Sequence, residues 1–336
     1  MWFGKDKSIL GVDIGTQAIK LVQLNSDNYL LETYGIVDLV EPITNQASEV
    51  VITQTAELLK TLCSKARVTT KRCAMSLPNQ TVFASVIDMP KMSDDELEQA
   101  IQFEAKKYVP LPITEVSLSW SLISEDPATN ITKVLLIAVP KQVRDMFITI
   151  FHKAGLELEV IEIEALALIR SLIDEQPQND VIIDIGAKVT GINFVKDGLL
   201  QLTRNLNIGG HTITEKIGQT LNLQLPRAEQ FKRDFGLNST DFLPEAVKPV
   251  LNSIKTEVKQ IIELYKSNKV IANRIILVGG GTQMPGLKEY FSDLSPNVII
   301  GDSLKKISYP AEVEEVLKRY SMQLPVAIGL AMRNNT

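Results

Sequence analysis

The chain has 336 residues, of which 45% are hydrophobic and 22% charged, and its formal net charge is −5. These values are ordinary for a globular protein of two or three modules, and without a basic field we expect no direct binding of nucleic acid or anionic lipid. Cys63 and Cys73 are too few for a disulfide framework and lack metal-site spacing, which favours a reducing compartment. The sequence has no signal-peptide pattern and no run of roughly 18 apolar residues, so we expect membrane contact only through a partner.

Strand and helix patterns alternate from the start of the chain. Residues 9–24 have the pattern of a strand, a glycine turn and a second strand, and residues 46–66 carry an apolar stripe of helical period. Strands are expected over 72–77 and 81–89, and Pro90 ends the second of them.

A compact β-α-β-β-α segment is expected over about residues 82–160. Its first helix starts at Ser93, which has Glu96 three residues later in the pattern of a capping box. Pro110 and Pro112 stop this helix. The remaining elements are paired strands over 116–124 and 133–139 and a helix over 141–154 that Gly155 closes.

The second half of the chain continues the alternation. A helix over 162–173 precedes a very apolar strand over 181–185, and further strands are expected within 191–206. The pattern is mostly helical over 211–265, and a buried strand over 275–278 then runs into three glycines. Strands that alternate with helices in this way indicate an α/β architecture.

Two segments half a chain apart resemble each other, namely Gly11–Lys20 and Ile182–Thr190. Each places Asp-Ile-Gly at the end of a strand, before small or polar residues and a second strand. A glycine at such a hairpin lets backbone N–H groups approach a phosphate, and Asp13 and Asp184 are suited to a magnesium ion, mainly through its water ligands. One copy alone is usually just a turn, but two copies predict hairpins that clamp a polyphosphate and its metal from both sides.

A third glycine-rich segment, residues 275–286, follows a buried strand. Gly279, Gly280 and Gly281 would let the backbone lie flat against a planar or sugar-phosphate group. A flexible strand-to-helix turn is the commoner use of such glycines, and the residues alone leave both interpretations open.

In this order the three segments resemble the phosphate-1, phosphate-2 and adenosine motifs of the actin, Hsp70 and sugar-kinase superfamily, over nearly the whole chain. Residues 163–168 look like the connect-1 helix and residues 325–331 like the connect-2 helix, whose small residues suit close packing at a hinge. The 82–160 segment resembles the 1C subdomain of the FtsA branch of this superfamily.

Within that branch the chain resembles the PilM family of type IV pilus assembly proteins. The resemblance rests on Phe3-Gly4 to Lys20, on Gly209–Thr214 and on Arg227–Lys232, and the missing C-terminal amphipathic helix fits this family better than FtsA. It implies an α/β fold of the duplicated actin-like (ribonuclease H-like) ATPase type, with subdomains 1A, 1C, 2A and 2B and with 1C in the FtsA-like position. Subdomain 1A is implied over 1–81 and over 161–178, the second range including connect-1, and an SHS2-like 1C over 82–160. Subdomain 2A is implied over 179–210 and 267–317, 2B over 211–266, and a C-terminal helix that returns to 1A over 318–336.

The resemblance also implies a function. PilM-like proteins bind ATP or ADP with Mg²⁺ in the cleft between the halves, and at most slow hydrolysis is expected. They bind the short cytosolic N-terminus of the membrane protein PilN in a groove between 1A and 1C. We therefore expect a cytoplasmic scaffold that is peripheral to the inner face of the cytoplasmic membrane, with the pilus assembly ATPase and further copies of itself as other candidate partners.

The same resemblance assigns residues to the nucleotide site. Glu164 in connect-1 either acts as a weak general base or is no more than a helix N-terminal charge. Glu229 and Lys232 share one helix face and either reach the adenosine or form a solvated ion pair. Asp13 and Asp184 are expected at the metal, whereas Lys20 is placed on a strand that could turn it away. The expected nucleotide contacts are Asp13, Gly15, Thr16, Gln17, Asp184, Gly186, Lys188, Thr190, Gly209, Gly210, Thr212, Glu229, Lys232, Gly279, Gly280, Gly281 and Met284.

Two other functions stay open at this point. The first is an actin-like cytoskeletal or cell-division protein, although the missing membrane helix weighs against FtsA and the 1C-like insert against MreB. A sugar-kinase-type phosphotransferase is less favoured, because no catalytic aspartate stands out beside Glu164.

Overall fold

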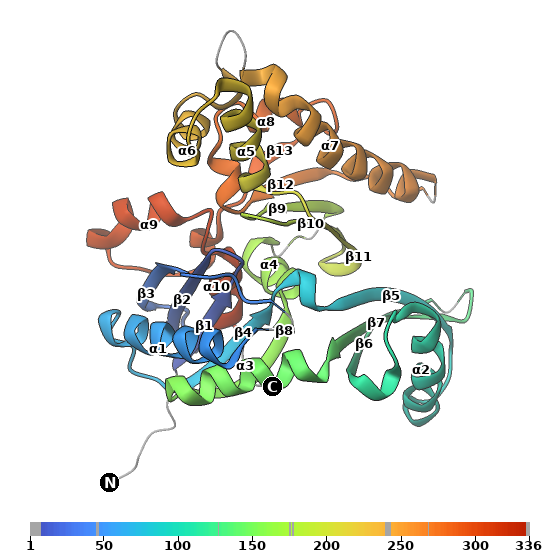
Figure 1. Ribbon diagram of the computed structural model, residues 1–336. Helices are drawn as coiled ribbons and strands as arrows, with labels where there is room; N and C mark the ends of the chain where they lie inside the picture. Colours follow the sequence, from blue (N-terminus) through green and yellow to red (C-terminus); the bar gives the residue numbers. More distant parts are fainter. Residues whose placement is uncertain are drawn as a thin grey trace.

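The computed structural model describes residues 8–333, apart from 45–46, 127, 175, 177, 239–242 and 268. Phe3-Gly4 and the last three residues, which entered the sequence-based expectations, therefore lie outside the described residues. Two five-stranded sheets of the same build dominate the fold, with orders β3-β2-β1-β4-β8 and β11-β10-β9-β12-β13 (Figure 1). In each sheet three consecutive strands pair antiparallel and the other two run parallel to the central strand, which confirms the duplicated α/β fold.

Most strands of the two sheets are expected from the sequence, whereas β3, β8 and β13 are not. The two central strands, β1 and β9, are almost completely buried, as expected where helices cover both faces of a sheet. The strands are β1 (Ser8–Ile14), β2 (Ala18–Asn25), β3 (Leu31–Asp38), β4 (Arg72–Leu77) and β8 (Glu157–Ile163) in the first sheet, and β9 (Asp180–Ile185), β10 (Thr190–Lys196), β11 (Leu199–Leu206), β12 (Arg274–Val278) and β13 (Val298–Ile300) in the second.

Helices cover the outer face of each sheet. The first sheet packs against α1 and α3, and the second against α5 and α7 (Figure 1). The stretch over 211–265, which the sequence predicts as mostly helical, holds α5, α6 and α7 within its described residues. The helices are α1 (Glu49–Lys65), α3 (Lys141–Ala154), α4 (Glu164–Leu172), α5 (Gly210–Leu221), α6 (Leu225–Asp234), α7 (Leu243–Ser267), α8 (Leu287–Tyr290), α9 (Glu314–Tyr320) and α10 (Pro325–Ala331).

Two short helices, α4 and α10, lie between the sheets and share one core with both. Gly329 of α10 sits against the backbone of Ala167 in α4, where a Cβ atom would find no space. Arg170 of α4 donates two hydrogen bonds of 2.9 Å to the buried carboxylate of Glu162 and a further one to the Gly329 carbonyl. This partly buried ion pair therefore ties both helices to the end of β8.

A separate three-stranded sheet, β5-β7-β6, projects from the first half together with one helix (Figure 1). The helix begins as expected, because the Glu96 carboxylate accepts a hydrogen bond of 3.0 Å from the Ser93 amide in a capping box. The elements of this insert are β5 (Phe83–Pro90), α2 (Asp94–Tyr108), β6 (Val116–Asp126) and β7 (Ile131–Pro140).

The insert is shorter than the sequence pattern suggested, since α3 and β8 belong to the first half. Phe147 and Phe151 of α3 are fully buried in the same core as Leu59 of α1, and β8 pairs parallel with β4. The helical period of residues 141–154 shows that one face is buried, but it carries no information about which sheet covers that face.

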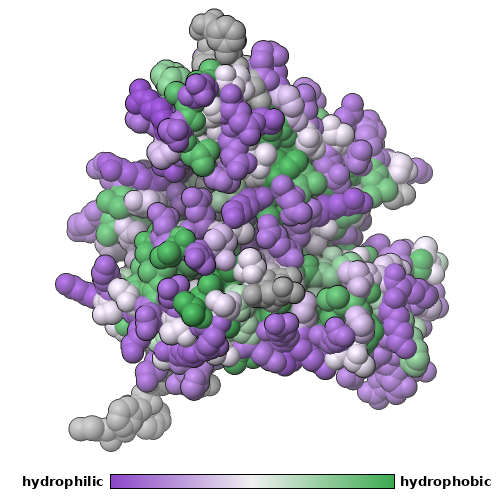
Figure 2. Space-filling view, viewed as in Figure 1, coloured by the Kyte–Doolittle hydropathy of each residue, from purple (hydrophilic) through white to green (hydrophobic). Residues whose placement is uncertain are grey.

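The chain returns to the first half at its end, where α10 packs against β2 and shares a core with Leu24 and Leu31. Within the described residues no helix has the length and apolar character needed to cross a membrane. Figure 2 shows hydrophilic side chains over most of one face, with smaller hydrophobic areas between them.

Candidate functional site

A cavity of about 450 Å³ lies between the two halves and is lined by both. Its walls come from equivalent positions: the β1–β2 and β9–β10 hairpins, and the loops that follow β4 and β12. Residues of α4, α5 and α6 and those around the start of α10 complete it. Open α/β sheets bind their ligands at strand ends of this kind, so the duplication itself builds the cleft.

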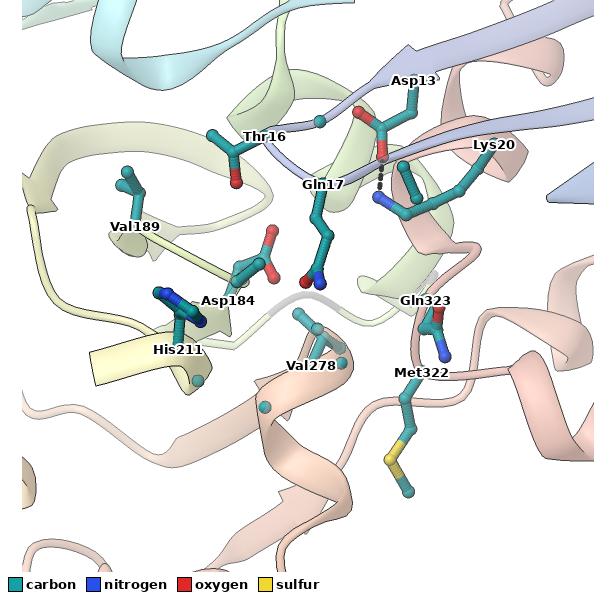
Figure 3. A pocket seen from close by; sticks show the side chains of 18 of the residues that line it. Asp13, Thr16, Gln17, Lys20, Asp184, Val189, His211, Val278, Met322 and Gln323 are labelled. Atoms are coloured by element: carbon teal, nitrogen blue, oxygen red, sulfur yellow. Dashed lines mark hydrogen bonds and ion pairs between the residues drawn. The ribbon is translucent and has the colours of Figure 1, made fainter. Parts of the chain in front are cut away.

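The two hairpins have the same backbone geometry. The amide of Gly15 donates to the Ala18 carbonyl at 3.0 Å, and the amide of Gly186 donates to the Val189 carbonyl at 2.9 Å. An aspartate precedes each glycine by two residues, and the side chains of Asp13 and Asp184 reach the same cavity from different halves, beside Gln17 (Figure 3).

Lys20 points into the cleft, contrary to the suggestion that it could face away. It lies directly across the hairpin from Asp13, and its Nζ donates a hydrogen bond of 2.7 Å to Asp13 Oδ2 (Figure 3). Although burial opposes the charge, Asp13 and the other nearby carboxylates raise the pKa of Lys20. The sequence held the necessary signal, because residues equidistant from a tight turn are cross-strand neighbours on one face.

Three carboxylates and one lysine share this end of the cleft. Burial, together with the charges of Asp13 and Asp184, raises the pKa of Glu164 well above its usual value. Burial raises the pKa of Asp184 to about 6, with Lys20 opposing and Asp13 adding to the shift. The site therefore has an excess of negative charge that a cation would relieve.

A hydrated divalent cation fits this set of groups. Within the described part of the chain no three His, Cys, Asp or Glu side chains are arranged to bind a metal directly. Mg²⁺ usually keeps several of its waters, and Asp13 and Asp184 can accept hydrogen bonds from such waters. Asp13 also accepts hydrogen bonds from Lys20 and from the Ser76 hydroxyl, which hold its carboxylate in place.

Asp184→Asn is expected to stabilise the nucleotide-free chain at pH 7 but not at pH 4. Because the pKa of Asp184 rises from 3.8 to about 6 on folding, the folded chain holds this proton more tightly than the unfolded chain. This contribution to the free energy of unfolding is full below about pH 4 and is lost as the pH rises through about 6, by roughly 3 kcal/mol. Urea unfolding of both chains at the two pH values measures it, and a pH-independent difference would show that Asp184 titrates normally.

The other wall of the cleft carries a buried polar cluster around Lys232, which is only 6% exposed. Its Nζ donates to the Gly210 carbonyl at 2.9 Å, to the Thr214 hydroxyl at 2.8 Å and to the Glu229 carboxylate at 2.6 Å. Burial lowers the pKa of Lys232, and although burial would raise the pKa of Glu229, hydrogen bonds from Lys232 and Thr214 hold it low. The pair is thus part of the wall and is not the solvated ion pair considered above.

The triple glycine lies against the second hairpin. Gly279 has φ = 90°, and a Cβ atom there would collide with Asp184 Oδ1 and lie 2.7 Å from the carbonyl carbon of Ile185. A Cβ atom on Gly281 would lie 2.9 Å from the Ile185 carbonyl oxygen. Glycine is therefore required for the loop to reach the end of β9, whatever the cleft binds.

Five of the expected contacts do not line the cavity, namely Lys188, Thr190, Gly209, Thr212 and Met284. Lys188 and Met284 match motif positions in the sequence, but neither side chain lies in the cleft. Lys188 is exposed, and Met284 is buried in the core of the second half. Thr190 and Thr212 hold backbone instead, since the Thr190 hydroxyl donates to the Ile208 carbonyl at 2.7 Å and the Thr212 hydroxyl accepts from the Gly209 amide at 3.4 Å. The expected residues that do line the cavity are Asp13, Gly15, Thr16, Gln17, Glu164, Asp184, Gly186, Gly210, Glu229, Lys232, Gly279, Gly280 and Gly281. Lining residues that the sequence did not assign to the nucleotide site include Lys20, Asn79, Gln80, His211, Thr214, Met322 and Gln323.

Comparison with known proteins agrees with this build. The family described as type IV pilus assembly protein PilM matches residues 11–335. The fold is similar to that in a PilM–PilN type IV pilus biogenesis complex, with a TM-score of 0.82 and 24% identity over 97% of this chain and 98% of that one. It is also similar to MreB5 of Spiroplasma citri bound to ADP, with a TM-score of 0.50 and 16% identity over 93% of this chain and 96% of that one.

Curated relatives include two further types of bacterial protein. The cell division protein FtsA of Streptococcus pneumoniae is 23% identical over 331 residues, which cover 83% of this chain and 72% of that protein. The ethanolamine utilization protein EutJ of Escherichia coli is 28% identical over 149 residues, 44% of this chain, and the match spans about half (49%) of its own length. With a family match over nearly its whole length, the chain belongs to the PilM family of type IV pilus assembly proteins.

Proposed function

We propose that the chain is an ATP-binding scaffold of the type IV pilus assembly platform. The observation that carries this proposal is the cleft, in which two equivalent hairpins bring Asp13, Asp184 and Lys20 together at one end. The buried cluster around Glu229 and Lys232 and the glycine loop form the other walls. Such a cleft has room and donors for a nucleoside polyphosphate, and related actin-like structures were solved with ADP or AMPPNP.

Each group has a distinct task in this proposal. Backbone N–H groups of the hairpins around Gly15 and Gly186 bind phosphate oxygens. Glycine allows this because, without a side chain, it lets the phosphate come close to the backbone. Lys20 adds a positive charge, and Asp13 and Asp184 hold the waters of a bound Mg²⁺. That ion neutralises the phosphate charge when it is bound. Glu164 lies at the same end and is the candidate general base for the slow hydrolysis that we expect.

Binding at both hairpins would favour the closed arrangement of the halves. A ligand shifts a conformational equilibrium only through contacts that differ between the two states. Here the two phosphate hairpins belong to different halves, so a polyphosphate that touches both makes those contacts only when the cleft is closed. The nucleotide would then act mainly as a conformational effector.

We further propose that the N-terminal cytosolic peptide of PilN recruits the chain to the inner face of the cytoplasmic membrane, through the groove between the first half and the insert. Support comes from the similarity to the PilM–PilN complex and from the family assignment. Further copies of the chain and the assembly ATPase are the other candidate partners on the membrane side.

A fluorescently labelled PilN N-terminal peptide is expected to bind the full chain with a Kd of about micromolar, measured by fluorescence anisotropy. Because only Val82 joins the cleft turn Asn79–Thr81 to the insert, we expect nucleotide binding to alter the groove, so saturating Mg-ATP should change this Kd. A scrambled peptide of the same composition is the control. Equal binding of the two peptides would contradict recruitment through PilN.

The similarity to FtsA over 83% of the chain supports one alternative, a nucleotide-dependent filament. Sedimentation of the chain with and without Mg-ATP separates the two functions. Polymers that pellet only with nucleotide, in the absence of peptide, would favour the filament.

A further inference from the structure

The turns that follow β4 and β12 have the same form in the two halves. In the first, the amide and hydroxyl of Thr81 donate to the Pro78 carbonyl at 2.8 and 2.7 Å. In the second, the amide and hydroxyl of Thr282 donate to the Gly279 carbonyl at 3.1 and 2.6 Å. Both turns line the cleft, but the second is built from glycines, whereas the first presents the side chain of Asn79.

Asn79 contacts both a carboxylate of the cleft and the second half of the molecule. Its Nδ2 donates a hydrogen bond of 2.6 Å to Glu164 Oε2, and its carbonyl accepts one of 3.3 Å from Asn205 Nδ2 in the second half. The side chain lies close to Gly191 of the second half, since a Cβ atom there would lie 3.2 Å from Asn79 Nδ2. Because it bonds both a cleft carboxylate and the other half, Asn79 has contacts that would change when the halves move.

We propose that Asn79 is a positioning residue that holds the Glu164 carboxylate at the phosphate end of the cleft and so lets the cleft prefer a nucleoside triphosphate over a diphosphate. This inference rests on the proposed nucleotide-binding function. The carboxylates and Lys20 mark the end where the terminal phosphate would lie. A cation bound there would favour the charged form of Glu164, and a glutamate freed from its amide donor would present this charge to that phosphate. A diphosphate ends one group earlier and would be affected less, because like-charge repulsion falls with distance.

The test compares Mg-ATP and Mg-ADP, each carrying a fluorescent ribose label, bound to the full chain and to Asn79→Ala. We expect the ATP affinity to fall about tenfold, as for the loss of a hydrogen bond to a charged group, and the ADP affinity to change less than about twofold. Gln102→Ala, which removes an exposed amide on α2 far from the cleft, is the matched control and should change neither.

A double-mutant cycle shows whether Asn79 acts through Glu164. In a Glu164→Gln background, which removes the charge but keeps the shape, Asn79→Ala should have almost no further effect on ATP affinity. Additive effects in the cycle, or an equal loss of ATP and ADP affinity, would overturn the proposal and leave Asn79 with a purely structural role. If the unaltered chain bound neither nucleotide, the proposed function would fail, and this inference with it.

Discussion

Gly329→Ala is expected to lower the free energy of unfolding by about 3 kcal/mol, the upper end of the usual cost of overpacking a core. A Cβ atom at this position would overlap the Ala167 carbonyl oxygen and lie 2.6 Å from its carbonyl carbon. These obstacles are backbone atoms, so no side-chain rotation can relieve them and α4 and α10 must move apart. Urea unfolding followed by circular dichroism measures the change.

Gly280→Ala is the matched control for this prediction. Its added Cβ atom would be 3.8 Å from the nearest heavy atom outside the turn, in the side chain of Gln323. Its stability should therefore change by less than about 1 kcal/mol. A Gly329→Ala chain as stable as the Gly280→Ala chain would mean that α4 and α10 can separate without cost and that their close packing does not contribute to stability.

Asp184→Ala is expected to weaken Mg-ATP binding by about 10- to 100-fold, the usual effect of removing a residue that holds a metal through its ligands. Asp184 is one of three carboxylates at this end of the cleft, and among the described residues it forms no ion pair, since the nearby Lys20 is bonded to Asp13. ATP binding without Mg²⁺ should weaken far less, because the lost contact is to the waters of the ion. Isothermal titration with and without Mg²⁺ measures both affinities.

Asp95→Ala serves as the control, since Asp95 is an exposed carboxylate on α2, far from the cleft. It should leave both titrations unchanged. An Asp184→Ala chain that kept its affinity for Mg-ATP would show that Asp184 does not hold the metal ion. The proposal that both hairpins contribute an aspartate to the metal site would then be contradicted.

Much of this fold was accessible from local patterns. The strand over 72–77 and the helix over 141–154 have the expected bounds, and Ser93 and Glu96 form the capping box that their spacing predicted. Short-range signals of this kind depend on turns, caps and periodicity, which the sequence records directly. The repeat of Asp-Ile-Gly also placed both hairpins at the cleft, because it identified the duplication.

The features that could not be predicted from the sequence depend on contacts between segments far apart in the chain. Asn79 matters because Glu164 and Asn205 come to it from 85 and 126 residues away. Met284 followed the glycine loop in the manner of a ligand residue, yet the direction of its side chain is set by the core of the second half. The partner of a buried helix face such as that of α3 is also a property of the whole fold.

The insert starts where the floor of the cleft ends, since only Val82 separates the Asn79–Thr81 turn from β5. A nucleotide in the cleft and a peptide bound in the groove beside the insert would thus contact segments joined by one very short stretch of backbone. Thermodynamic linkage requires that if the peptide changes the affinity for the nucleotide by some factor, the nucleotide changes the affinity for the peptide by the same factor. A pilus machine could therefore set the nucleotide state of this protein from the membrane side, merely by offering or withdrawing a peptide.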